Sequence, residues 1–96
     1  MEGNIIIFRL PPKTKNTTLS KFCQKLYGQD TSSHHGKYRY HRNGLLDDIP
    51  HRKLIRGVLI VKTNDTNAIN ELLKEFNAEI HIRKIEFIDE DINELL

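Results

Sequence analysis

The segment from His34 to Gly44, HHGKYRYHRNG, gathers side chains that can do chemistry. It holds three histidines, two tyrosines and three cations within eleven residues. Because imidazole titrates near neutral pH, histidines can supply the general base and the general acid for RNA cleavage without a metal. Adjacent histidines in a polar loop also occur at surfaces without any catalytic role. Metal-independent ribonuclease activity is therefore an alternative prediction, and its candidate residues are His34, His35 and His41.

The cations and tyrosines of this segment favour binding over catalysis. In a strand, alternate residues share a face, so a strand over 37–42 would carry cations on one face and tyrosines on the other. Cations neutralise phosphates, and tyrosines stack on unpaired bases. A second cationic cluster follows at 52–56. We therefore predict a nucleic-acid partner, RNA in particular, contacted by Lys37, Tyr38, Arg39, Tyr40, Arg42, Arg52, Lys53 and Arg56.

Two other interpretations of these cations stay open. Charge on an edge strand prevents edge-to-edge pairing of sheets, so the segment could be purely structural. An exposed edge strand could instead pair with a second copy or a protein partner, which would make the chain a homodimeric interaction module. The adjacent Asp47 and Asp48 would point apart in a strand, so we expect them to form a turn or to lie in solvent. No metal site and no cofactor are predicted.

Charge is distributed unevenly along the chain. Residues 1–62 hold twelve Lys and Arg against four Asp and Glu, whereas residues 63–96 hold three against nine. Such asymmetry indicates an electrostatic partner, unless folding interleaves the two halves. The acidic end, 89–96, could serve solubility, could occupy the basic surface when no ligand is bound, or could dock its leucines on a protein partner.

The composition is that of a soluble domain, with 38% hydrophobic and 29% charged residues. We predict a single domain over 1–88, followed by an acidic C-terminal tail over 89–96. The longest apolar runs, IIIF and VLIV, are too short to span a bilayer, and no signal peptide is expected. The single Cys23 fits the reducing cytoplasm and is predicted to lie in the core.

Apolar runs predict the strands of the core. Residues 4–10 (NIIIFRL) and 53–63 (KLIRGVLIVKT) are rich in β-branched residues and predict buried strands. Residues 79–87 (EIHIRKIEF) predict a third strand, whose apolar positions slip by one residue. A bulge at Arg83-Lys84 would explain that slip.

The middle of the chain predicts a hairpin. Residues 29–36 are polar and predict a loop, and the tyrosines of 37–42 favour a strand. Asn43-Gly44 is a strong signal for a two-residue turn. Residues 45–50 would then return as a short strand or loop, which Pro50 ends.

Two helices are predicted from apolar residues that recur at helical spacing. The first is capped by Asn16 or Thr17 and ends at Gly28, and the second is capped by Asp65 or Thr66. Their apolar stripes are Leu19, Phe22, Cys23, Leu26 and Tyr27 in the first helix, and Ile69, Leu72, Leu73 and Phe76 in the second.

The resulting order is β-α-β-β-α-β, which predicts an α+β, ferredoxin-like sandwich: an antiparallel sheet with two helices on one face. The strands that are apolar throughout, around IIIF and VLIV, should be central.

At IIIFRLPP and RGVLIVKT the chain resembles an RNA recognition motif. Ile5 to Leu10 matches the hydrophobic frame of that family's first-strand signature, and Arg56-Gly57 resembles the basic-Gly pair that opens its third strand. The resemblance implies the ferredoxin-like fold and RNA binding. The family stacks bases on aromatic side chains of these strands, whereas this chain has Ile6 and an aliphatic third strand at the corresponding places. The likeness is therefore one of fold rather than of binding residues.

Overall fold

The computed structural model describes residues 1–33 and 38–95, and the side chains of 1–31 and 40–95. The chain forms two compact units: unit 1 comprises Met1–Lys13 and Ile49–Leu96, and unit 2 comprises Thr14–Asp48. Within the described residues there are three α-helices, a four-stranded antiparallel sheet and a two-stranded sheet. The protein is therefore of the α+β class. No helix in this part of the chain combines the length and the apolar character that crossing a membrane requires.

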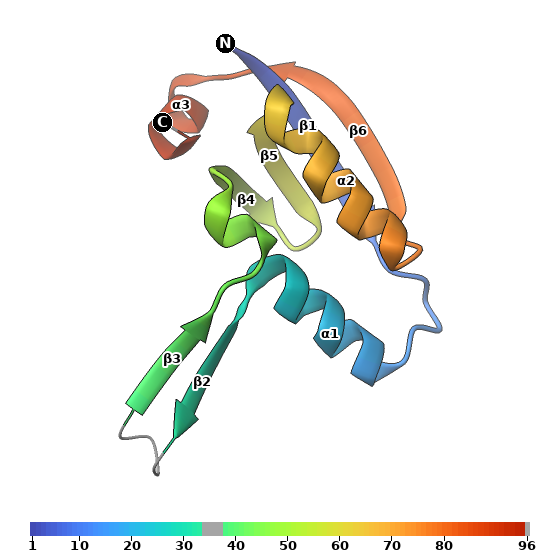
Figure 1. Ribbon diagram of the computed structural model, residues 1–96. Helices are drawn as coiled ribbons and strands as arrows, with labels where there is room; N and C mark the ends of the chain where they lie inside the picture. Colours follow the sequence, from blue (N-terminus) through green and yellow to red (C-terminus); the bar gives the residue numbers. More distant parts are fainter. Residues whose placement is uncertain (34–37, 96) are drawn as a thin grey trace. The chain divides into compact units, whose positions relative to one another are not determined.

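Unit 1 is built on the four-stranded sheet (Figure 1). Its order is β4 (His51–Ile55), β5 (Val58–Lys62), β1 (Glu2–Arg9) and β6 (Glu79–Glu86), and every neighbouring pair is antiparallel. The two strands that were predicted to be central, from the runs IIIF and VLIV, are central. Each of these strands has a hydrogen-bonded neighbour on both of its edges, and one side of each is fully buried, at Ile6 in β1 and at Leu59 in β5.

One face of the sheet packs against α2 (Thr66–Glu75), which follows the short 3-10 helix η2 (Thr63–Asp65). Asn4 donates its side-chain N–H to the hydroxyl of Thr66, at the start of α2, over 2.8 Å. Ile6 and Leu59 are directly paired, so they share this face, and neither has exposed surface. On the helix side Ile69 and Leu73 are likewise fully buried. We call this side of the sheet the α2 face.

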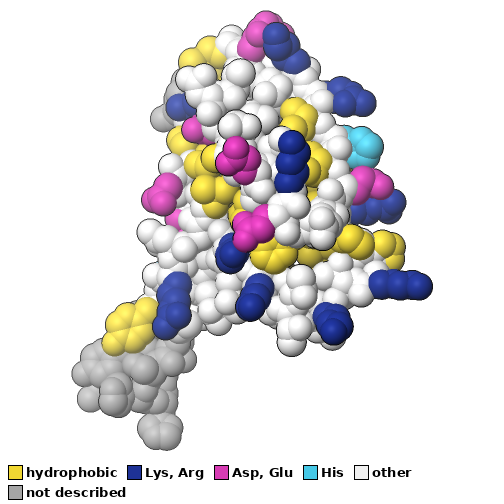
Figure 2. All heavy atoms as spheres, turned by 45° about the vertical axis from the view of Figure 1, so that its right-hand side comes forward, with side chains coloured by type: hydrophobic (Ala, Val, Ile, Leu, Met, Phe, Trp, Pro, Cys, Tyr) yellow, Lys and Arg dark blue, Asp and Glu magenta, His cyan; other side chains and the backbone are white. Residues whose placement is uncertain are grey.

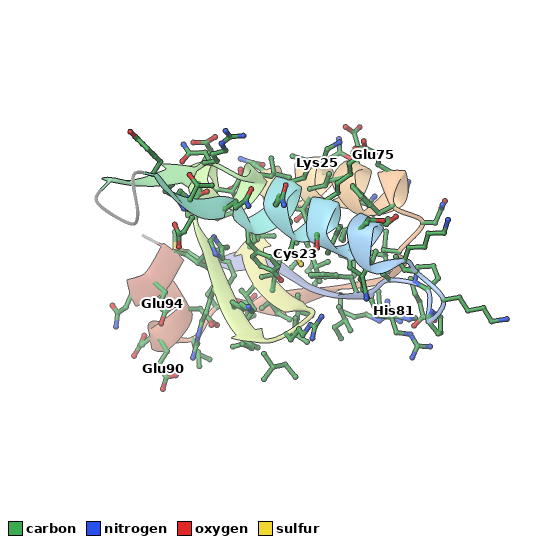
Figure 3. All side chains as sticks on the ribbon, turned by 90° about the horizontal axis from the view of Figure 1, so that it is seen from below. Cys23, Lys25, Glu75, His81, Glu90 and Glu94 are labelled. Atoms are coloured by element: carbon green, nitrogen blue, oxygen red, sulfur yellow. The ribbon has the colours of Figure 1, made fainter. Side chains whose placement is uncertain are left out.

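The opposite side, the α3 face, carries two rows of paired residues. Each row has one residue on each of the four strands. From β4 to β6 these rows are Arg52, Ile60, Ile5 and Arg83, and Ile55, Val58, Ile7 and His81. The predicted acidic tail forms α3 (Asp89–Leu95), which lies on this side (Figure 3).

Two predictions about the strands of unit 1 are wrong. Residues 53–63 are not one strand, because the chain turns at Arg56-Gly57 between β4 and β5. Gly57 has a φ of +84°, which glycine tolerates and which permits the tight turn. The bulge expected at Arg83-Lys84 is also absent, since β6 pairs with β1 without a break from Glu79 to Glu86. The apolar residues change sides along β6 because Ile82 lies on the α2 face and Ile85 on the opposite face.

Unit 2 contains α1 (Asn16–Tyr27), β2 (Gln29–Ser33), β3 (Tyr38–Arg42) and the 3-10 helix η1 (Leu45–Asp48). In α1, Phe22 and Leu26 are buried, as predicted. Cys23 is exposed, so its prediction as a core residue is wrong. It lies about 100° around the helix from Phe22, at the margin of the apolar stripe.

The predicted hairpin is placed differently in the structure. β3 pairs with β2 in a separate two-stranded sheet and does not join the main sheet. Residues 29–33, expected to be loop, form the partner strand. Asn43-Gly44 does not turn a hairpin, because the Gly44 N–H donates to the Asp47 carboxylate and starts η1 instead.

Candidate nucleic-acid interface

The β2–β3 hairpin presents part of the predicted interface. Gln29 pairs with Arg42, Asp30 with His41 and Thr31 with Tyr40. Tyr40 and Arg42 are two residues apart on β3, so they share one face, and His41 projects from the other. The Tyr40 side chain is 56% exposed, and Arg42 is also exposed. The hairpin therefore presents an aromatic ring and a cation to solvent on the same face.

His41 is held between two carboxylates, an arrangement that we call the His41 clasp. Its Nδ1 lies 2.7 Å from Asp30 Oδ1, and its Nε2 lies 2.7 Å from Asp47 Oδ2. The hydrogen bond to Asp47, and next the one to Asp30, raise the pKa of His41 above its ordinary value. Both ring nitrogens can donate only in the imidazolium form, which the two carboxylates favour.

The clasp changes what His41 can do. A general base needs a free ring nitrogen that reaches the proton of a substrate. Both nitrogens of His41 are occupied, so the geometry assigns this residue to holding β3 against β2 and η1. The other two histidines of the ribonuclease alternative, His34 and His35, lie outside the described residues.

The second predicted cluster lies in unit 1 and does not share a single face. Arg52 and Lys53 are paired with Ile60 and Leu59, which lie on opposite faces of the sheet. Arg56 is exposed in the turn after β4. The structure therefore separates these three cations, although they are close in sequence.

Arg52 is already engaged by α3. Its Nη1 donates to Asp91 Oδ1 over 2.7 Å and its Nη2 to Glu90 Oε2 over 3.0 Å. These two bonds, the one to Asp91 first, raise the pKa of Arg52. Asp91 is 4% exposed, and its Oδ2 also accepts the N–H of Ile88. A phosphate at Arg52 would therefore meet two carboxylates that already bind its guanidinium.

Folding redistributes the charge that is uneven along the sequence. Unit 1 holds nine Lys and Arg against ten Asp and Glu, whereas unit 2 holds six against three. Contacts such as those of Arg52 with α3 and of Arg9 with Glu79 bring the basic and acidic ends together in unit 1. On the surface that Figure 2 shows, basic and acidic side chains are interspersed. The excess of positive charge therefore belongs to unit 2.

Three predicted residues have no described side chain. Lys37 lies outside the described residues. Tyr38 and Arg39 have a described backbone in β3, but their side chains lie outside the described part. Among the residues that the structure describes, no group of three or more His, Cys, Asp and Glu side chains is arranged to hold a metal.

Sequence reasoning missed the carboxylates that engage His41 and Arg52. Asp47 lies in the 3-10 helix η1 rather than in the predicted turn, and its role as an acceptor for His41 was not foreseen. Asp30 lies in a segment that was expected to be a loop, so the sequence did not predict its hydrogen bond to His41. For Asp91 there was a partial signal, since one alternative placed the acidic tail on a basic surface.

Comparison of the chain with models of protein families, with curated proteins and with solved structures found no match.

Proposed function

We propose that this protein binds single-stranded nucleic acid, RNA in particular, through the β2–β3 hairpin. The observation that carries the proposal is the exposed ring of Tyr40 on the same face as Arg42. More than half of the Tyr40 side chain is exposed to solvent, so packing in the core does not explain why an aromatic residue occupies this position. Stacking of one base on such a ring contributes about 1–3 kcal/mol.

The charge of unit 2 supports this choice of surface. Its net charge is +3, with six Lys and Arg against three Asp. Half of those cations lie within three residues of Tyr40 in the sequence, namely Lys37, Arg39 and Arg42. Cations near an exposed ring would let the backbone phosphates follow the hairpin while bases stack.

The His41 clasp would prepare the hairpin for binding. A two-stranded hairpin is only marginally stable by itself. Two hydrogen bonds from one imidazole join β3 to β2 through Asp30 and to η1 through Asp47. A strand that is already ordered loses less conformational freedom when it binds, which favours affinity.

We also infer a ferredoxin-like arrangement with an insertion. The order β4-β5-β1-β6 supports it, with α1, β2 and β3 lying between β1 and β4 in sequence. The likeness to RNA recognition motifs is proposed at the level of fold alone. The proposed contacts differ from that family's, because the exposed tyrosine belongs to the inserted hairpin. A cytoplasmic setting stays a prediction.

Fluorescence anisotropy with a labelled single-stranded RNA of about twelve nucleotides tests the proposal. Three hairpin cations, at about −0.7 each, predict a log–log salt slope of about −2. Tyr40→Ala should weaken binding by about 1–3 kcal/mol with an unchanged slope, because it removes stacking alone. Arg42→Ala should flatten the slope by about 0.7.

Matched variants separate this mechanism from general effects. Tyr40→Phe keeps the ring and should bind nearly as the wild type does. Lys74→Ala removes an exposed cation of α2 in unit 1 and should leave the slope unchanged. The proposal fails if affinity does not respond to salt, or if Tyr40→Ala binds as tightly as Tyr40→Phe. Shortened RNA after incubation would favour the ribonuclease alternative at His34 and His35.

A further inference from the structure

The α3 face of unit 1 already carries one helix, and that helix indicates what the surface can bind. Asp91 and Leu95 are four residues apart, so they share one side of α3. Asp91 bonds Arg52 at the edge of the sheet, and Leu95 is 3% exposed. Ile60, next to Arg52 in the same row, is 5% exposed. This part of the face therefore accepts a carboxylate from a short helix, and the same side of that helix carries a buried leucine.

The rest of that face repeats the same pattern. The row that begins with Arg52 and Ile60 continues with Ile5 and ends with Arg83 on β6. Arg83 mirrors Arg52 at the other edge, and it is exposed. Its guanidinium donates to the carbonyl of Ile82, and no carboxylate bonds it within the described part of the chain. Arg83 beside Ile5 can therefore bind a carboxylate, as Arg52 beside Ile60 binds Asp91 of α3.

The neighbouring row leaves large aliphatic side chains in solvent. Ile7 is 41% exposed and Ile55 is 67% exposed, and both lie on the α3 face with Val58 between them. Exposed apolar residues that gather on one surface mark binding sites for other proteins. Aliphatic side chains do not stack bases as aromatic rings do, so this surface suits a protein better than a nucleic acid.

The dimensions leave space for one more helix. Four strands about 4.8 Å apart give a sheet about 14 Å wide between its edge strands. Helices pack at interaxial distances of about 8–10 Å, so one helix bonded to β4 at Arg52 leaves β1, β6 and the Ile55 end of β4 uncovered. Figure 3 shows α3 at one end of this side, with His81 of β6 toward the other end.

We propose that the uncovered part of the α3 face, defined by Ile5, Ile7, Ile55 and Arg83, binds an acidic amphipathic helix of a protein partner. The helix presents an aspartate or glutamate to Arg83 and a leucine, four residues later, to the isoleucines. Charge complementarity selects the acidic partner, as it does for α3. This docking site belongs to unit 1 and does not depend on RNA binding.

An NMR titration of the isotope-labelled full chain tests the docking site. The probe is an acetylated, amidated peptide with the sequence of residues 87–96, FIDEDINELL. Because so short a helix is marginal in isolation, we expect a dissociation constant near the millimolar range. The amides of Ile5, Ile7 and Arg83 should shift and saturate. A control peptide with lysine in place of Asp91 and serine in place of Leu95 should leave them unchanged.

Two adjacent cations of β6 provide matched variants of the protein. Arg83 lies on the α3 face, whereas Lys84 pairs with Asn4 and lies on the α2 face. Arg83→Gln should weaken peptide binding about tenfold, as expected when one charge of a complementary pair is removed. Lys84→Gln should change the affinity less than about twofold. Equal effects of the two variants would overturn the proposal.

Three other results would also overturn it. Shifts limited to Arg52, Ile60 and α3 would mean that the peptide only exchanges with the protein's own helix. Shifts of Ile7 and Ile55 on concentrating the chain without peptide would assign the surface to a second copy. Shifts of the same amides with a single-stranded RNA would assign it to nucleic acid.

Discussion

Arg52 and Asp91 are joined by a 2.7 Å hydrogen bond between residues that are 39 positions apart in the chain. The two oxygens of Asp91 have different roles. Oδ1 binds the guanidinium of β4, and Oδ2 accepts the N–H of Ile88 just before α3 begins. One buried carboxylate therefore both caps the helix and fastens it to the sheet.

Removal of Arg52 should loosen α3. Arg52→Met leaves the Asp91 carboxylate buried without its charged partner, which is unfavourable. We expect a lower urea midpoint and altered amide shifts over α3. Arg9→Met is the control, because the Arg9 and Glu79 side chains are 71% and 52% exposed and exposed pairs contribute little. A midpoint that falls equally in both variants would contradict the fastening role.

The His41 clasp should make stability depend on pH above neutrality. The bonds to Asp47 and Asp30 raise the pKa of folded His41 above the unfolded value of 6.5. A raised folded pKa gives a contribution that is full below about pH 6.5 and is lost as pH rises through the folded value. We expect the urea midpoint to fall as pH rises above about 6.5, and NMR titration of the imidazole to give a pKa above 6.5.

His41→Gln should remove that fall with pH, whereas His81→Gln should keep it. His81 is a suitable control because it is an exposed histidine near Glu79 in unit 1. If both variants show the same pH profile as the wild type, the clasp makes no contribution to stability.

The two adjacent leucines of α2 should differ in their effect on stability. Leu73 has no exposed surface, whereas Leu72 is only half-buried. Leu73→Ala should lower the free energy of unfolding by about 2–5 kcal/mol, because it leaves a cavity in the core. Leu72→Ala should cost less than Leu73→Ala in the same urea titration. The reverse order would mean that α2 presents a different side to the sheet.

The turn between β4 and β5 should depend on Gly57. Its φ is +84°, and a Cβ there would lie 2.6 Å from the carbonyl oxygen of Phe8. Gly57→Ala should therefore destabilise the protein by about 1–3 kcal/mol, from backbone strain and this contact. Arg56→Ala changes the other turn residue, which is exposed, and should be close to neutral in the same thermal melt. Similar melting temperatures for the two variants would rule out a strained turn.

The sequence predicted those elements whose signal is local. The runs IIIF and VLIV correctly predicted the two central strands, because strands with a neighbour on each edge tend to be apolar throughout. The stripes around Phe22 and around Ile69 gave two helices with the correct buried side. Each of these signals depends on residues that are close together in the chain.

The features that the sequence did not predict depend on partners that are distant in the chain, or on segments with little intrinsic preference for a strand. Residues 29–33 contain only polar side chains, and they form a strand because β3 supplies the pairing. The turn at Gly57 interrupts a segment that was predicted to be one strand. At Asn43-Gly44, where a turn was expected, the Gly44 N–H instead donates to the Asp47 carboxylate. Arg52 was predicted to be available for phosphate, but Asp91 meets it only after the chain has folded.

The hairpin begins and ends at nearly the same point of the chain's path. A Cβ on Gly44 would collide with the backbone N of Gly28, so the residue after α1 and the residue before η1 are in direct contact. A segment whose two ends coincide can be lengthened, shortened or exchanged while the residues on either side keep their positions. A graft of residues 29–43 onto another scaffold would therefore need two touching glycines to receive it, and a carboxylate at the place of Asp47 to keep the bond to His41.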